Sequence, residues 1–96
     1  MLYYNYILYS ESHDLYYKGI DENISRRLYE HNSGKTRYSD GKGPWRLVYL
    51  KTAVTKSEAP IEEKRLKRLN KRSLESLIIS AGNEIEQGNI GFNSEG

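Results

Sequence analysis

Three groups of residues in the first two thirds of the chain carry side chains suited to chemistry on a phosphate group. Tyr6 and Tyr17 lie in two tyrosine-rich segments, Arg27 and His31 are four residues apart, and Glu63 stands among basic residues. A phenol can relay a proton, and a guanidinium binds phosphoryl oxygens through a planar fork. A carboxylate is a ligand for a hard divalent cation.

Each group also has a purely structural interpretation. Tyr6 and Tyr17 could be stacked core residues, and a tyrosine with the usual pKa near 10 is a poor base at neutral pH. Arg27 and its neighbour Arg26 could both be solvated surface charges. A lone glutamate on an exposed helix, such as Glu63, is usually an ion-pair partner. The residue types alone leave these alternatives open.

A hairpin must position the tyrosines. Tyrosine-rich, apolar segments at Tyr3–Ser10 and Leu15–Gly19 predict two strands, and the short polar stretch between them predicts their connection. Alternation along the first strand separates its residues into two sets, one with Tyr4, Tyr6 and Leu8 and the other with Asn5, Ile7 and Tyr9. Tyr6 and Tyr17 can then point to the same sheet face from neighbouring strands.

A helix must position the arginine and the histidine. Asn23 is a suitable N-cap, and Ile24 and Leu28 form the apolar stripe of a helix that ends near Asn32. Arg27 and His31 are one turn apart on this helix, so their side chains lie one above the other. Arg27 falls near the boundary of the buried face, where it can reach a phosphate over the sheet.

The second half of the chain predicts one strand and two helices. Trp45–Leu50 is apolar enough to be buried on both faces of a sheet, with Trp45 as a core anchor. Ser57 is a suitable N-cap for a helix to Asn70, and Ser73 is one for a last helix. The inward residues that we expect are Ile61, Leu66 and Leu69 in the first of these helices and Leu74, Leu77 and Ile78 in the second. The predicted fold is an α+β (α/β) single domain, with a three-stranded, mainly antiparallel sheet flanked by helices.

The charge and composition of the chain indicate which partners and which cellular compartment suit it. Residues 1–80 carry a net charge of +5 and residues 81–96 carry −3, so the predicted domain is basic and favours polyanions. Residues 81–96 are polar and glycine-rich, and we expect a mobile tail. The chain has no cysteine, no apolar run as long as a membrane span and no signal peptide pattern. These features fit a cytoplasmic protein.

Five ordered segments of the chain resemble the GIY-YIG nuclease superfamily. Tyr4-Asn5-Tyr6 and Tyr17-Lys18-Gly19 stand where that family has its two signature motifs, although Lys18 replaces an apolar residue. After this hairpin the likeness continues through Asn23–Gly34, Gly43–Tyr49 and Ser57–Ala59, and then through Glu63 with Leu66-Lys67, although Pro60 interrupts the stretch before Glu63. It spans roughly residues 2–79. Within that superfamily, the chain looks like the small stand-alone bacterial branch, which is related to the UvrC endonuclease domain and to Slx-type nucleases.

This resemblance implies a metal-dependent endonuclease that hydrolyses DNA to a 5′-phosphate and a 3′-hydroxyl. It implies that Glu63 holds one Mg²⁺ or Mn²⁺ ion and that Arg27 stabilises the charge that develops on the phosphoryl group. It further implies that Tyr6 accepts a proton from the attacking water, directly or through a relay. Tyr17 and His31 would position that network.

Two other classes of function stay open. The same fold could hold branched or single-stranded nucleic acid without cutting it, or it could be a structural or protein-interaction domain. Basic residues suited to tracking a phosphate backbone are Lys35, Arg37, Lys42, Lys67, Lys71 and Arg72. The preferred DNA structure, RNA as a substrate, the oligomeric state and a protein partner that supplies specificity are left open by the sequence.

Overall fold

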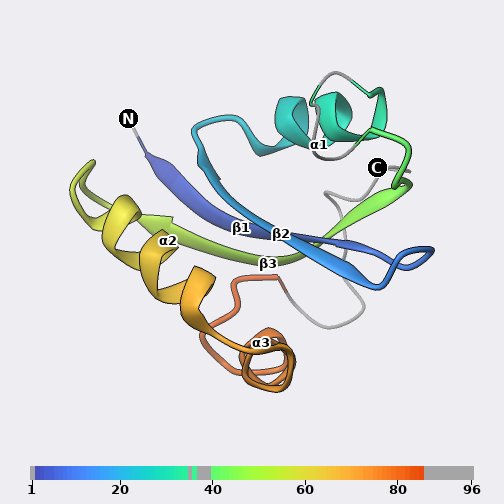
Figure 1. The fold of residues 1–96 in the computed structure, drawn as a ribbon. Helices are drawn as coiled ribbons and strands as arrows, with labels where there is room; N and C mark the ends of the chain where they lie inside the picture. The colour runs from blue at the N-terminus through green and yellow to red at the C-terminus, as the bar shows by residue number, and fades with distance from the viewer. Residues whose placement is uncertain (1, 35, 37–39, 86–96) are drawn as a thin grey trace.

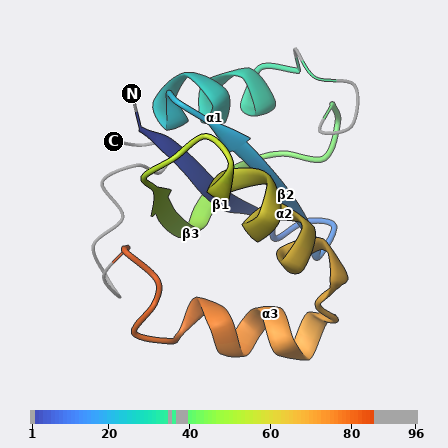
Figure 2. The same ribbon diagram turned by 90° about the vertical axis from the view of Figure 1, so that its left-hand side faces the viewer.

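The computed structural model describes residues 2–34, 36 and 40–85, and it has three layers (Figures 1 and 2). A three-stranded sheet lies between helix α1 on one face and helices α2 and α3 on the other. The elements follow the chain as β1 (Tyr3–Ser10), β2 (Leu15–Asp21), α1 (Ile24–Asn32), β3 (Trp45–Ala53), α2 (Glu58–Arg68) and α3 (Lys71–Ile78). The predicted α+β fold with a three-stranded sheet is confirmed.

The sheet has the order β2-β1-β3, and both pairings are antiparallel. β1 is therefore the central strand, and it is the most buried of the three. Residues of β1 alternate between the two faces of the sheet, as the sequence predicts. Tyr6 and Leu8 face the core under α1, whereas Ile7 faces the core under α2 and α3.

An irregularity in β3 explains how that strand buries large residues on both faces. Ile7 pairs with Tyr49 and Leu8 pairs with Leu47, so Val48 is an extra residue at a bulge. Simple alternation would put Leu47 and Tyr49 on one face. The bulge instead sends Leu47, with Trp45, to the α1 face and Tyr49 to the α2 face.

The helix caps differ from the sequence predictions in two places. Asn23 caps α1 as expected, because its side chain accepts a hydrogen bond from the Arg26 N–H at 3.0 Å. α3 is capped by Asn70, which accepts from the Ser73 N–H at 2.8 Å, so the prediction that Ser73 caps this helix is wrong. Ser57 stands at the N-cap position of α2 as predicted, but its side chain makes no capping hydrogen bond, and α2 ends at Arg68 rather than Asn70.

One predicted core residue of α2 lies outside the core. Leu66 is fully buried and Leu69 packs against it, but Ile61 is 70% exposed. The inward stripe of α2 runs instead through Ala59, Glu62 and Leu66, of which Ala59 is also buried. Packing in the core therefore does not explain why residue 61 is an isoleucine.

Asn83 fixes the chain that follows α3 to the outer strand of the sheet. Its side-chain nitrogen donates to the carbonyl oxygens of Val48 and Ile78, each at 2.8 Å. Its side-chain oxygen accepts from the Leu50 N–H at 3.1 Å. These bonds give partners to backbone groups at the edge of β3, which would otherwise be open to pairing with another strand.

Glu84 and Ile85 extend this attachment. The Glu84 carboxylate accepts from the backbone N–H and the hydroxyl of Thr52, both at 2.7 Å. Ile85 packs against the core under α1. Of the segment for which we expect a mobile tail, residues 83–85 therefore contact the sheet, and residues 86–96 lie outside the described residues.

Candidate active site

The two tyrosines lie side by side on the α1 face of the sheet. Leu8 of β1 pairs with Tyr17 of β2, and Tyr6 pairs with Gly19, so Tyr6 and Tyr17 project to the same side. Their ring centroids are 6.2 Å apart. Tyr6 is 1% exposed, whereas Tyr17, on the edge strand, is half-buried. The prediction that Tyr6 and Tyr17 point to the same face of the sheet is therefore confirmed.

Gly19 makes room for the Tyr6 hydroxyl. A Cβ atom at position 19 would lie 2.6 Å from the Tyr6 hydroxyl oxygen and 2.7 Å from the ring carbon that bears it. Both distances are well inside contact distance, so any larger residue would displace the ring. The absence of a side chain at this position lets the Tyr6 phenol extend across β2 toward the space beneath α1.

His31 reaches the same phenol from the last turn of α1. Its Nε2 lies 3.5 Å from the Tyr6 hydroxyl, and its Nδ1 lies 3.0 Å from the Thr36 hydroxyl. Its ring centroid is 4.4 Å from that of Tyr17 and 6.3 Å from that of Trp45. His31 is 1% exposed, so the imidazole is part of the core as well as of the polar network.

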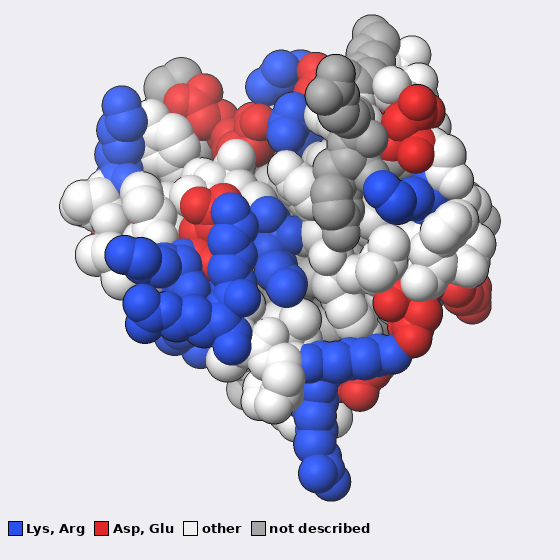
Figure 3. All heavy atoms as spheres, viewed as in Figure 1, with Lys and Arg blue, Asp and Glu red and all other residues white. Residues whose placement is uncertain are grey.

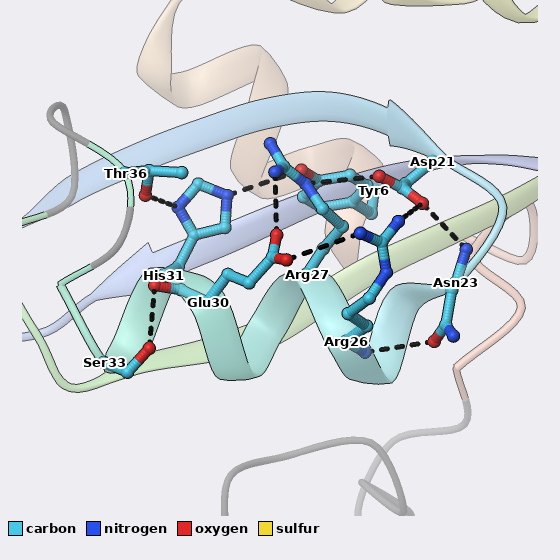
Figure 4. A network of polar contacts seen from close by, with 9 residues as sticks. All are labelled: Tyr6, Asp21, Asn23, Arg26, Arg27, Glu30, His31, Ser33 and Thr36. Atoms are coloured by element: carbon cyan, nitrogen blue, oxygen red, sulfur yellow. Dashed lines mark hydrogen bonds and ion pairs between the residues drawn. The ribbon is translucent and has the colours of Figure 1, made fainter.

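Arg27 is held one turn earlier on α1 by three neighbours (Figure 4). Its Nη1 donates to a Glu30 carboxylate oxygen at 3.0 Å, and its Nε lies 3.3 Å from an Asp21 carboxylate oxygen. Its guanidinium also lies close enough to Tyr6 to act against the rise in the pKa of that phenol. Its side chain is 24% exposed, so Arg27 does stand at the boundary of the buried face.

Arg26, in contrast, points away from this cluster. Its side chain is 55% exposed, and it pairs with Asp21 at 3.2 Å and with Glu30 at 3.4 Å on the outside of the helix. The two arginines therefore share their acidic partners but differ in burial. Of the two arginines, Arg27 is the one that acts on the pKa of Tyr6 in the described part of the chain.

Burial determines the protonation of the network. It raises the pKa of Tyr6 to about 12, although the hydrogen bond from Arg27 acts in the opposite direction. Burial, together with the nearby charge of Arg27, lowers the pKa of His31 to about 4. At neutral pH the cluster therefore contains a neutral phenol, a neutral imidazole and a guanidinium cation.

Glu63 comes from the other side of the sheet. It lies on α2, which packs against β2 and β1, and its carboxylate is 3.3 Å from Nζ of Lys67. Its side chain is 27% exposed. Among the described residues no three His, Asp or Glu side chains stand close enough together to form a metal cluster. A cation here would have one protein carboxylate and would keep most of its waters, which is a coordination that Mg²⁺ accepts.

The predicted phosphate-tracking residues fall in three places. Lys67, Lys71 and Arg72 are exposed on α2 and α3, where Figure 3 shows basic side chains gathered on the face turned to the viewer. Lys42 precedes β3 and is half-buried. Lys35 and Arg37 lie outside the described residues.

Four contacts of the cluster are absent from the sequence-based list of site residues. Glu30 lies three residues after Arg27, so helix spacing could have identified it as a partner. Gly19 is the last residue of the second tyrosine motif and Asp21 follows it, but their contacts depend on strand register. Thr36 lies in the connection after α1, and neither periodicity nor a motif marks it.

The fold and this cluster of two tyrosines, an arginine and a histidine define a class of protein. The GIY-YIG catalytic domain matches residues 2–76, which is most of the chain, and the chain belongs to this family. A GIY-YIG domain implies a nuclease-type function, and nucleases of this family typically use divalent metal ions.

Similar proteins come from diverse prokaryotes. The chain is 42% identical over 67 residues to UPF0213 protein OB0043 of Oceanobacillus iheyensis, covering 69% of this chain and 77% of that protein. It is 36% identical over 87 residues to UPF0213 protein BH0048 of Halalkalibacterium halodurans, covering 90% and 92%. The solution NMR structure of BH0048, recorded under Bacillus halodurans, has a TM-score of 0.56 at 36% identity and covers 85% of this chain and 87% of that one.

In the part of the chain that the structure describes, every helix is too short or too polar to cross a membrane.

Proposed function

We propose that this protein is a metal-dependent endonuclease that hydrolyses phosphodiester bonds in DNA, leaving a 5′-phosphate and a 3′-hydroxyl. The observation that carries this proposal is the convergence of a phenol, an imidazole and a guanidinium from β1 and α1. The Tyr6 hydroxyl lies 3.5 Å from Nε2 of His31, and Arg27 acts on the pKa of the same phenol, so the three groups act at one place. Family membership adds the nuclease class.

Arg27 supplies the charge that phosphoryl transfer requires. Its hydrogen bonds with Tyr6 and Glu30 outweigh the effect of burial and raise its pKa, so the guanidinium is a permanent cation. Asp21 and Glu30 fix its orientation. A preorganised guanidinium stabilises negative charge on the phosphoryl oxygens more strongly in the transition state than in the bound substrate.

Tyr6 and His31 supply a route for the proton of the attacking water. With a pKa of about 12, Tyr6 is neutral at pH 7 and is not itself an effective base. His31 is also neutral and can accept a hydrogen bond at Nε2. The Tyr6 oxygen takes the proton from the water while its own proton passes to Nε2 of His31, and the imidazole stays neutral by releasing its Nδ1 proton toward Thr36, so the phenol and the imidazole act as a relay. Tyr17 packs against the imidazole and holds its orientation.

Glu63 would hold one Mg²⁺ or Mn²⁺ ion. Its described partner is the exposed Lys67, which water can replace at small cost. A bound divalent ion would supply Lewis-acid stabilisation of the phosphate and of the leaving oxygen. Glu63 would hold that charge on α2, and Arg27 would act from α1.

The basic surface would hold the backbone of the substrate. Residues 1–80 carry a net charge of +5, and the exposed Lys67, Lys71 and Arg72 stand at the end of α2 and the start of α3. Phosphate contacts of this kind give affinity without reading sequence. DNA in the cytoplasm is the substrate that we favour, and RNA is included in the test.

Cleavage assays test the proposal directly. Labelled branched, nicked and linear DNA, with an RNA control, would be incubated with Mg²⁺ or Mn²⁺ and with a chelator. We expect cutting that the chelator abolishes. Binding without cutting under all these conditions would contradict the endonuclease proposal and favour a nucleic-acid-binding module of the same fold.

The variant Glu63→Ala tests the metal assignment. We expect it to lose metal-dependent cleavage, because the cation would have no protein ligand, while the fold and the affinity for DNA largely persist. Glu75→Ala, which removes an exposed carboxylate from α3, is the matched control. Cleavage by Glu63→Ala at the wild-type rate would show that Glu63 does not hold the metal.

A further inference from the structure

Lys18 is a half-buried lysine on the open edge of the sheet. It lies in the edge strand β2 opposite Ile7, so its side chain projects to the α2 face. In the part of the chain that the structure describes, Lys18 makes no ion pair and no side-chain hydrogen bond. The described side-chain atoms that are buried without a partner belong to Asn5 and Arg27, so the Lys18 ammonium reaches solvent. The stem of the side chain is therefore covered, while its charge stays unpaired.

A lysine on an edge strand can have a purely structural role, since its charge discourages pairing with another strand. That role requires only an exposed charge, whereas Lys18 is half-buried. The second signature motif of the family has an apolar residue at this position, and an apolar side chain would pack there without leaving a charge. The described residues thus leave the charge of Lys18 without a counter-charge.

The candidate metal ligand Glu63 faces the same edge of the sheet. Ala59 and Leu66 are the buried residues of α2 and mark its inward direction. At about 100° per residue, Glu62 and Glu63 lie roughly 50° to either side of that direction. Glu62 lines a pocket together with residues of β3, so Glu63 leans to the opposite side, toward β2, against which α2 also packs (Figure 2).

Lys18 and Glu63 lie at a similar level along β2. Ile7, the partner of Lys18 in the sheet, packs in one cluster with Leu66, which is less than one turn after Glu63. The Glu63 carboxylate pairs with Lys67 at 3.3 Å. This edge therefore has two lysines beside one carboxylate, and a divalent cation on Glu63 would add further positive charge. Such a site attracts an anion.

The other face of the same strand indicates which anion this is. Tyr17 and Gly19, the two neighbours of Lys18 in the sequence, project to the α1 face and lie beside Tyr6. The edge of β2 thus separates the cluster under α1 from Glu63 on α2. A substrate that meets both must cross this edge, and a nucleic acid carries a negative charge on each phosphate along its length.

We propose that Lys18 binds a backbone phosphate next to the scissile one, where the DNA strand crosses the open edge of β2. Its ammonium donates to a non-bridging phosphate oxygen, which is a charge-assisted hydrogen bond. Lys18 is then a substrate-positioning residue, because phosphate contacts fix the strand without reading its sequence. The identity of the ligand rests on the proposed function, whereas the contact itself concerns binding and not the chemical step.

The salt dependence of DNA binding tests this contact without any cleavage. The affinity for labelled DNA would be measured in a chelator over a range of salt concentrations for the wild type, Lys18→Met and Lys18→Arg. Each neutralised phosphate of B-DNA contributes about 0.9 to the slope of log K against log salt concentration. We therefore expect Lys18→Met to reduce the slope by about one and to weaken binding several-fold at low salt, and Lys18→Arg to keep the slope.

Lys51→Met is the matched control. Lys51 lies on the same face of the sheet but in the other edge strand, β3, where it lines a pocket with Glu58 and Glu62. The variant makes the same change of charge, and we expect it to keep the slope of the wild type. Methionine retains the aliphatic stem, so both variants should fold, as thermal unfolding would check. Equal slopes in Lys18→Met and Lys51→Met would overturn the proposal.

Single-turnover cleavage separates positioning from catalysis. We expect Lys18→Met to raise the DNA concentration for half-maximal rate several-fold, with a rate at saturating DNA close to that of the wild type. A loss at saturation as large as that of Arg27→Ala would overturn the positioning role. Wild-type protein that does not bind DNA would contradict the proposed function together with this proposal. Wild-type cleavage with an unchanged salt slope in Lys18→Met would contradict this proposal alone.

Discussion

The two faces of the sheet bury different kinds of residue, although they share the strands that separate them. Under α1 the core includes a phenol, an imidazole and an indole, and both Tyr6 and His31 have hydrogen-bonding partners. Under α2 and α3 the hydrophobic cluster consists of Ile7, Tyr49 and leucines, and Asn5 is the buried polar residue of β1 on that side. On that side the charged residues stand mainly at the surface, as on α2 and α3.

This difference shows how a small domain can combine stability with a reactive cluster. A buried polar group is tolerated when its hydrogen-bonding partners are held in place. On the α1 face of the sheet, those partners come mainly from α1, β1 and β2. The second face lacks such a cluster, and its apolar packing provides a support for β1. Changes at the α1 face should therefore affect chemistry first, and changes elsewhere should affect stability or binding.

The largest expected effect is the loss of Arg27. If it stabilises the transition state, Arg27→Ala should lower single-turnover cleavage about 100- to 1,000-fold with a much smaller change in DNA affinity. Arg27→Lys should recover only part of the rate, because lysine keeps the charge but not the planar fork. Affinity would be measured separately in Ca²⁺.

Arg26→Ala is the matched control for this prediction. Arg26 is the neighbouring residue on α1 and has the same acidic partners, but its side chain is more than twice as exposed. We expect it to lower the rate far less than Arg27→Ala does. Equal and small losses at both positions would mean that both arginines are surface charges.

His31 should make the stability of the α1 face depend on pH. Its pKa is about 4 in the folded protein, below the usual 6.5, so the unfolded chain takes up a proton first as the pH falls. Stability should therefore be lost between about pH 6.5 and pH 4, by up to roughly 3 kcal/mol from this group. Urea unfolding across this range would measure it.

The histidine variants isolate that contribution. His31→Gln should reduce the slope of stability against pH between pH 6.5 and pH 4, whatever its effect at pH 7. His13→Gln removes the exposed histidine of the β1–β2 connection and is the matched control. An unchanged slope in His31→Gln would contradict the burial of a neutral imidazole in this network.

Gly19 tests how tightly the α1 face is packed. Gly19→Ala places a methyl group 2.6 Å from the Tyr6 hydroxyl oxygen, so we expect a loss of about 1–3 kcal/mol in stability and a lower cleavage rate. Gly82→Ala meets only the Ser80 hydroxyl, at 3.6 Å, and should change little. Thermal unfolding of both variants checks this. Wild-type stability in Gly19→Ala would mean that the Tyr6 ring moves at no cost.

Much of the α1 face could be predicted from the sequence because its signals are local. Alternation in β1 places Tyr6 and Leu8 together, and helical spacing places Arg27 above His31. The bulge at Val48 is different, since it depends on how two distant strands pair, and sequence periodicity alone would have kept Leu47 and Tyr49 on one face. The contacts of Gly19 depend on register in the same way.

The structure on the α2 and α3 face of the sheet was harder to predict than that on the α1 face. Ile61 has the right spacing for a core residue, but α2 lies so that Glu62 occupies the inward position. The attachment of Asn83 to β3 is made by a polar side chain in a glycine-rich stretch, where composition indicates disorder. The orientation of α2 and the attachment of Asn83 both depend on tertiary contacts, and such contacts leave no periodic pattern in the sequence.

The segment after α3 connects the two faces, and its removal gives the smallest effect that we predict. Truncation after Ser80 would leave the backbone groups of Leu50 and Val48 without their Asn83 partners and would remove Ile85 from the α1 core. Since these groups would regain water at the sheet edge, we expect a loss of about 1–2 kcal/mol rather than unfolding. Truncation after Ile85 is the control, because it keeps all of these contacts. If both truncated proteins melt at the same temperature, the attachment of residues 83–85 does not stabilise the domain, and the support for β3 must come from α2 and α3 alone.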